Sequence, residues 1–213
     1  SKRRSNRGMP VVTLKGLPLL DTVYPGASTG PAADADLLFI NGETFAEYAP
    51  ALEELGWSCR NEGTTTSQWR GSSGAEIDVH RFIRDWFCSS MLRADFVRDW
   101  RWVEGQRVRL PVPSAEALMM HVMLHGTLYS PSDTNSRWVL DAALLLRHTP
   151  DLDWQRVFEL AAAHAWLAPI ADCIELLCTL EQRPLPERLA ELRAQERLPL
   201  HARLARARWL GTW

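Results

Sequence analysis

Two aspartates stand two positions apart where an apolar run begins, in the stretch PAADADLLFI at residues 31–40. The apolar residues predict a buried strand over 36–40. Side chains at positions i and i+2 of a strand point to the same face, so Asp34 and Asp36 would lie about 7 Å apart on one face. Two carboxylates at this distance repel each other. The pattern therefore indicates a positive charge between them, and a divalent metal ion is the simplest candidate.

Composition excludes several classes of protein. The 213-residue chain is 46% hydrophobic, which is enough for the core of one domain or of two small ones. Its net charge of −2 argues against extensive coating of nucleic acid, and we expect no DNA partner. The four cysteines show neither CxxC nor zinc-finger spacing, and neither a secretory leader nor a long apolar span is visible. We expect a cytoplasmic protein with reduced cysteines and no membrane partner.

The beginning of the chain predicts a basic arm, a strand, a turn and a helix. Residues 1–10 carry four basic side chains and predict a disordered arm, which is either a solvated tail or a phosphate contact. The apolar residues 9–14 predict a strand, which is followed by the turn Lys15–Gly16 and by a helix over 17–24. The sequence therefore predicts a strand-turn-helix unit upstream of the two aspartates.

Turn residues and alternating polarity predict a hairpin over 57–83, after a helix over 41–56 that Gly56 closes. On the last strand of this hairpin the side chains divide between the two faces: Ala75, Ile77 and Val79 on one, and Glu76, Asp78 and His80 on the other. The polar face of this strand again carries an aspartate.

Beyond residue 110 the spacing of apolar residues is helical. Ser114 is a plausible N-cap, and further helices are expected over about 136–147, 153–165, 168–181 and 186–208. The arginines of the last segment are either a basic surface for an acceptor or the solvated face of a helix. The sequence thus predicts an α+β protein in which a disordered arm (1–10) precedes an α+β core (11–110) and an all-helical C-terminal domain (111–213).

The acidic residues and the early turn together indicate a site for a metal-bound polyphosphate. Asp34, Asp36 and Asp78 supply hard oxygen ligands that suit Mg²⁺, with Mn²⁺ as the alternative, and such ions share their remaining positions with substrate phosphates. Two metals held by three carboxylates can clamp the attacking and leaving oxygens of a phosphoryl displacement. Gly16 lets backbone N–H groups approach an anion, and Lys15 adds a positive charge beside it.

The motifs VVTLKGLPLLDTVYP, DADLLFI, LEELGW, EIDVH and LHG…RWVLDAALLLRH…DWQRVFELAAAH occur in this order over residues 11–180. In these motifs the chain resembles the uncharacterised nucleotidyltransferase family, a branch of the DNA polymerase β-like superfamily. The resemblance implies a small mixed β-sheet flanked by helices, followed by a helical region that helps to hold nucleotide or acceptor.

Carried over position by position, the resemblance implies that Asp34 and Asp36 are the metal-binding pair and that Asp78 is the third carboxylate, which binds metal or draws a proton from the acceptor. Lys15 and Gly16 stand where the superfamily has its phosphate-binding turn, although that turn is usually Gly-Ser or Gly-Gly. An arginine that relatives often carry before the aspartates is replaced here by Gly30.

The histidines leave alternatives open. His121 and His125 would share a helix face, but the glutamate of the H-E-x-x-H zinc motif is absent between them. The resemblance favours a nucleotide contact for His125, and the alternative is a hydrogen bond to Asp141 between packed helices. His80 would point to the same side as Asp78, where it either orients a carboxylate or meets a phosphate of the nucleotide.

Two classes of function follow from these residues. The first is a Mg²⁺-dependent nucleotidyltransferase, which moves a nucleoside monophosphate from a nucleoside triphosphate to an acceptor hydroxyl or phosphate on RNA, protein or a small molecule and releases pyrophosphate. The alternative is a catalytically degenerate module that binds a nucleotide or a protein on the same fold. Retention of all three aspartates favours the enzyme, because clustered carboxylates cost stability when no cation neutralises them.

Overall fold

The computed structural model describes residues 11–14, 16–24, 35–39, 45–81, 98–104, 109–126, 137–163, 166–187, 189 and 191. The chain divides into two units, each with its own internal contacts. Unit 1 comprises Ser1–Pro18 and Ser28–Val112, and unit 2 comprises Leu19–Ala27 and Pro113–Trp213. The division falls inside helix α1 (Gly16–Thr22), which therefore begins in one unit and ends in the other.

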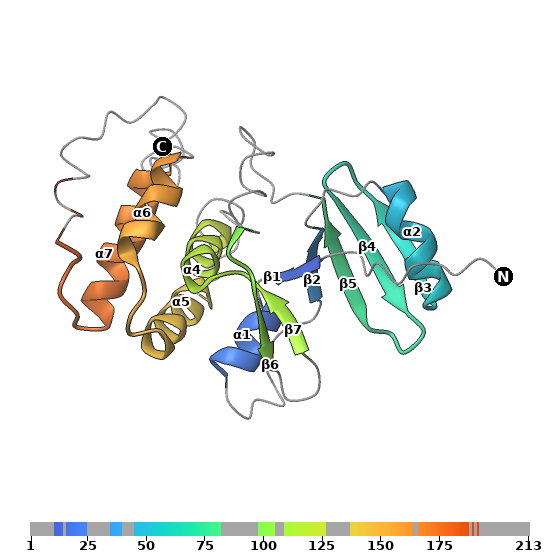
Figure 1. Ribbon diagram of the computed structural model, residues 1–213, viewed down its shortest axis with the longest axis horizontal. Coiled ribbons are helices and arrows are strands. Elements are labelled where there is room, and N and C mark those ends of the chain that lie inside the picture. Colours follow the sequence, from blue (N-terminus) through green and yellow to red (C-terminus); the bar gives the residue numbers. More distant parts are fainter. Residues whose placement is uncertain are drawn as a thin grey trace. The chain divides into compact units, whose positions relative to one another are not determined.

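Unit 1 is built on a five-stranded sheet with the strand order β1-β2-β5-β4-β3 (Figure 1). The strands are β1 (Val11–Leu14), β2 (Ala35–Phe39), β3 (Trp57–Glu62), β4 (Thr66–Gly71) and β5 (Glu76–His80). Strand β2 pairs in parallel with β5, and the other neighbouring strands pair antiparallel. The sheet is thus mixed, and the predicted α+β fold class is confirmed.

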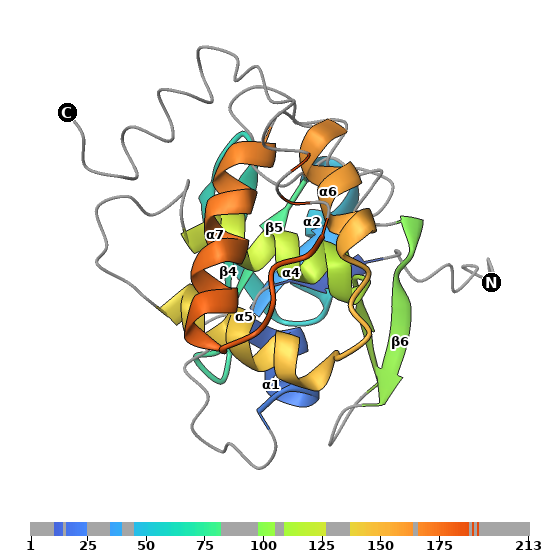
Figure 2. The same cartoon turned by 90° about the vertical axis from the view of Figure 1, so that its left-hand side faces the viewer.

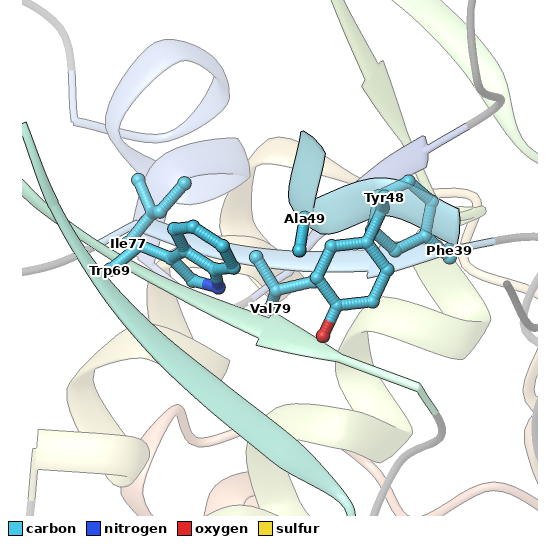
Figure 3. Close-up of a cluster of buried hydrophobic side chains, with 6 residues drawn as sticks. All are labelled: Phe39, Tyr48, Ala49, Trp69, Ile77 and Val79. Atoms are coloured by element: carbon cyan, nitrogen blue, oxygen red, sulfur yellow. The ribbon is translucent and has the colours of Figure 1, made fainter. Parts of the chain in front are cut away.

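Helix α2 (Phe45–Glu54) covers one face of this sheet, and the two elements share a buried core. Figure 3 shows its members, which come from three strands and the helix: Phe39, Tyr48, Ala49, Trp69, Ile77 and Val79. The Phe39 and Tyr48 rings stack with their centroids 4.7 Å apart. Gly56 follows the helix with a φ of +83°, a conformation that favours glycine, which confirms the predicted C-terminal end. The core therefore fixes which face of each strand is buried.

Two aromatic side chains in this core also carry polar atoms, and both bond to one hydroxyl. The Trp69 indole N–H donates to Ser67 Oγ at 2.7 Å, and Tyr48 Oη lies 2.8 Å from the same oxygen. Tyr48, Ser67 and Trp69 are all buried. Because a buried polar group without a partner is costly, Ser67 is the residue that allows both rings to be buried here.

A second, two-stranded sheet also belongs to unit 1. Strands β6 (Arg101–Glu104) and β7 (Arg109–Val112) pair antiparallel. A hydrogen bond attaches this two-stranded sheet to the main sheet: Thr13 Oγ1 of β1 donates to the backbone carbonyl of Pro111 on β7, at 2.8 Å. These two strands were not predicted from the sequence. Each has only four residues, so the alternation in polarity is too short to identify from the sequence.

Unit 2 contains the helices α4 (Ala115–Leu124), α5 (Arg137–His148), α6 (Trp154–Ala163) and α7 (Leu167–Leu180), which Figure 2 shows from one side. Nine of the ten residues of α4 are buried, as expected for a helix that contacts α5, α6 and α7. Ser114 caps α4 by accepting a hydrogen bond from the Ala117 amide at 3.2 Å, as predicted. In the part of the chain that the structure describes, no helix is long and apolar enough to cross a membrane.

Candidate active site

The parallel pairing of β2 and β5 places two aspartates side by side. Asp36 is directly opposite Asp78, and Leu38 is opposite His80. Since Leu37 and Val79 point toward α2, the alternation of side chains sends Asp36 and Asp78 to the opposite face. The predicted alternation of β5 is confirmed, because Ile77 and Val79 are buried in the core while Asp78 is half-buried. The sheet therefore presents two carboxylates from adjacent strands on its other face.

His80 joins this pair through a hydrogen bond to Asp36. Its Nε2 lies 2.8 Å from Asp36 Oδ1, and its Nδ1 lies 3.2 Å from Thr66 Oγ1. Thr66 stands directly opposite His80 on the neighbouring strand β4. A polar chain thus crosses three adjacent strands, from Thr66 on β4 through His80 on β5 to Asp36 on β2.

Asp36, Asp78 and His80 each offer a ligand atom, and these three atoms lie within 4.8 Å of one another. Asp36 is 4% exposed and the His80 side chain 14%, so both are largely shielded from water. Two carboxylates held this close in partly dry surroundings favour a positive charge between them. Carboxylate oxygens are the donors that Mg²⁺ and Mn²⁺ prefer, so these residues fit a divalent cation.

Burial changes steadily along the row of residues that contains the two aspartates. The register runs from Leu14 on β1 through Asp36 and Asp78 to Gln68 on β4. Leu14 is 1% exposed, Asp36 is buried, Asp78 is half-buried and Gln68 is exposed. The row is therefore closed at β1 and open to water at β4.

The structure brings together three of the site residues predicted from sequence, namely Asp36, Asp78 and His80. Asp34 and Lys15 lie outside the described residues, and Gly16 is the first residue of α1. Sequence reasoning missed Thr66, since its position opposite His80 depends on the register of the β4–β5 pair. The signal available was the length of the SSG turn between these strands.

His125 lies at the C-terminal end of α4, in unit 2. Its ring stacks on that of His121, with the ring centroids 6.1 Å apart and the planes 10° from parallel, so the two share a helix face as predicted. Asp141 accepts a hydrogen bond from the Tyr24 hydroxyl and lies 3.7 Å from Arg137 Nε. The alternative of a hydrogen bond between His125 and Asp141 stays a prediction. The nucleotide contact of His125 stays a prediction.

The Tyr24 hydroxyl is held in its neutral form. Partial burial, together with the hydrogen bond to the negative Asp141, raises the pKa of Tyr24 from 10.0 to about 12. Tyr24 belongs to the segment Leu19–Ala27, which joins unit 2 although it lies between two strands of unit 1 in the sequence. This hydrogen bond therefore links that segment to α5 within the helical unit.

The mixed sheet thus presents carboxylates from two adjacent parallel strands on one face and packs against a helix on the other. The chain belongs to the uncharacterised nucleotidyltransferase family, whose model matches residues 2–180. The resemblance recognised from the sequence motifs is thus confirmed, and the protein is a nucleotidyltransferase.

Two solved structures are similar to parts of this chain. The antibiotic-resistance factor ANT(2'')-Ia is 17% identical with a TM-score of 0.49, and the match covers 74% of this chain and 83% of that protein. The lincosamide antibiotic adenylyltransferase LnuA, solved with lincomycin bound, is 14% identical with a TM-score of 0.42, covering 64% of this chain and 85% of its own. No curated protein sequence matches the chain significantly. The assignment rests on the family match.

Proposed function

We propose that Asp36 and Asp78 hold a divalent cation, Mg²⁺ or Mn²⁺, and that the protein transfers a nucleoside monophosphate from a nucleoside triphosphate to an acceptor hydroxyl or phosphate. The observation that carries this proposal is the direct pairing of Asp36 with Asp78, whose ligand atoms lie within 4.8 Å of each other. Asp34, which the sequence pairs with Asp36, would complete the set of three carboxylates, because it stands two positions before Asp36.

The site residues have different surroundings, and these suggest different roles. A cation bound here would neutralise charge on the triphosphate and polarise the phosphorus under attack. Asp36 is buried and bonded to His80, so it is suited to hold the cation in a fixed place. Asp78 is half-buried and nearer the open end of the row, so it can also accept the proton of an acceptor hydroxyl.

The reaction would proceed by direct displacement at the α-phosphorus. The acceptor oxygen forms a bond to this phosphorus while the bond to the β-phosphate oxygen breaks, and pyrophosphate leaves. The acceptor proton passes to Asp78. The nucleotide contacts expected from sequence are Lys15 and Gly16 for the triphosphate, together with His125 and, in one of its two alternatives, His80.

The acceptor would approach over β4. The row of residues is closed at Leu14 and open at Gln68, which stands directly opposite Asp78. An exposed amide at this position can hydrogen-bond a hydroxyl-bearing acceptor on RNA, protein or a small molecule. We therefore expect Gln68 to contact the acceptor.

Nucleotide-dependent stabilisation tests this function. The unfolding temperature would be measured with ATP, GTP, CTP and UTP, with and without Mg²⁺, for wild type, Asp36→Asn/Asp78→Asn and Glu76→Gln. Glu76 is the matched control, because it is exposed and lies on the same strand and face as Asp78. A ligand at about 100 times its dissociation constant adds roughly 2.7 kcal/mol, which raises the unfolding temperature by several degrees.

We expect at least one nucleotide to stabilise wild type and Glu76→Gln in the presence of Mg²⁺ and to leave the double variant unchanged. An equal Mg²⁺-dependent shift in the double variant would show that the cation binds elsewhere. Absence of a shift with every nucleotide in wild type would overturn the proposal.

A further inference from the structure

The role of His80 goes beyond the proposed function and rests on it, because His80 lies at the same site. We propose that His80 is a positioning residue, which orients the Asp36 carboxylate toward the cation rather than binding the cation or the nucleotide, and that Thr66 holds its imidazole ring in place. Three adjacent strands supply the three groups, so the sheet itself holds them in line.

The contact with Asp36 determines where the imidazole of His80 carries a proton. An ionised carboxylate can only accept hydrogen bonds, so the 2.8 Å contact between His80 Nε2 and Asp36 Oδ1 requires a proton on Nε2. The Thr66 hydroxyl lies 3.2 Å from Nδ1, and a hydroxyl can either donate to a lone pair or accept from an N–H. The two contacts together hold the imidazole ring in one orientation.

The hydrogen bond from His80 also orients the Asp36 carboxylate. The hydrogen bond from Nε2–H to Oδ1 fixes the orientation of the carboxylate, and so the direction in which its remaining lone pairs point toward a cation. Asp36 and His80 are both largely shielded from water, which strengthens a hydrogen bond to a charged group. Groups that hydrogen-bond a metal ligand usually change metal affinity by about 10–100-fold when they are removed. His80 would therefore affect cation binding without touching the cation.

A role of His80 as a direct ligand of the cation would require Nε2 to be unprotonated. If His80 were itself a ligand, Nε2 would have to offer a lone pair to the cation, and Nδ1–H would donate to the Thr66 hydroxyl instead. The hydrogen bond from Nε2 to Asp36 would then be lost. The protonation state of Nε2 thus separates the two roles.

Two spectroscopic measurements on the full-length wild-type protein test this point. Nitrogen-15 NMR of the histidine side chains, with the His80 signals assigned through His80→Gln, should show Nε2 protonated both without and with Mg²⁺. Pulsed EPR of the Mn²⁺-loaded protein should show no directly coordinated imidazole nitrogen. A coordinated nitrogen that disappears in His80→Gln would overturn the positioning role, and so would loss of the Nε2 proton when Mg²⁺ is added.

Mn²⁺ affinity, measured from the EPR signal of the free ion, supplies a second readout. His80→Leu should bind Mn²⁺ about 10–100-fold more weakly than wild type. Thr66→Val should also weaken binding, and Thr66→Ser, which keeps the hydroxyl, should restore it. Thr179→Val is the matched control, since Thr179 is exposed on α7 of unit 2 and its hydroxyl donates to a helix carbonyl.

The outcomes separate this inference from the proposed function. If the wild type binds no Mn²⁺ or Mg²⁺, the proposed function itself is wrong. If the wild type binds Mn²⁺ and a folded His80→Leu binds it equally well, only the positioning role of His80 is wrong. Circular dichroism of each variant establishes that it is folded.

Discussion

Replacing Asp78 with asparagine should stabilise the protein when no cation is bound. The ligand atoms of Asp36 and Asp78 lie within 4.8 Å of each other. Two full charges at that distance repel by about 3.5 kcal/mol at an effective dielectric constant of 20. The hydrogen bond from His80 to Asp36 and the partial exposure of Asp78 reduce this value. We therefore expect a net gain in the free energy of unfolding of about 1–2 kcal/mol, because the substitution removes one of the two charges.

Thermal unfolding in the presence of EDTA is the appropriate assay. In a chain of this length 1 kcal/mol corresponds to roughly 2–4 °C, so the unfolding temperature of Asp78→Asn should rise by about 2–8 °C. Addition of Mg²⁺ with the stabilising nucleotide should reverse the order, since only wild type gains the energy of binding. Glu76→Gln is the control variant, because it makes the same change in charge two residues away on the same face of β5. In wild type, Arg70 Nε lies 3.8 Å from Glu76 Oε1.

The control variant should change stability by less than about 0.5 kcal/mol, because exposed ion pairs contribute little. A lower unfolding temperature for Asp78→Asn in EDTA would refute the reasoning. It would mean that the native contacts of Asp78 outweigh its repulsion with Asp36, and that the site is not strained by the absence of a cation.

Two further predictions concern hydrogen bonds away from the site. Ser67→Ala should destabilise the protein by about 2–4 kcal/mol in urea unfolding, since the two buried aromatic groups that bond its hydroxyl lose their partner; an effect below about 0.5 kcal/mol would contradict this. The pKa of Tyr24 is raised to about 12 by burial and by its bond to Asp141, so its stabilising effect is complete below pH 10 and is lost between pH 10 and 12. The difference in unfolding temperature between wild type and Tyr24→Phe should therefore shrink above pH 10, and a constant difference would contradict this origin.

Local features of the fold could be predicted because their cause lies within a few residues. The burial of Ile77 and Val79, with Asp78 on the other face, follows from the two-residue repeat of a strand. Ser114 caps its helix by a bond to an amide only three residues further on. Gly56 ends its helix because its own backbone adopts a positive φ.

The arrangement of the site could not be predicted in the same way. From the sequence Asp36 and Asp78 are two acidic residues on two strands, and nothing local says that these strands are neighbours. The structure places β2 next to β5 rather than next to β3, and this choice of neighbour depends on contacts between distant segments of the chain. The contact between His80 and Asp36 depends on the same choice.

The sequence alone determined the elements other than β6 and β7, together with their buried faces and the family, since helical and strand periods, caps and motifs lie in short stretches of chain. The tertiary structure decided which strands are neighbours, that Thr66 lies against His80, and that Leu19–Ala27 belongs to the helical unit. The physical reason is that register and neighbour choice are set by packing between segments far apart in the chain, where many weak contacts act together and no single residue carries the signal.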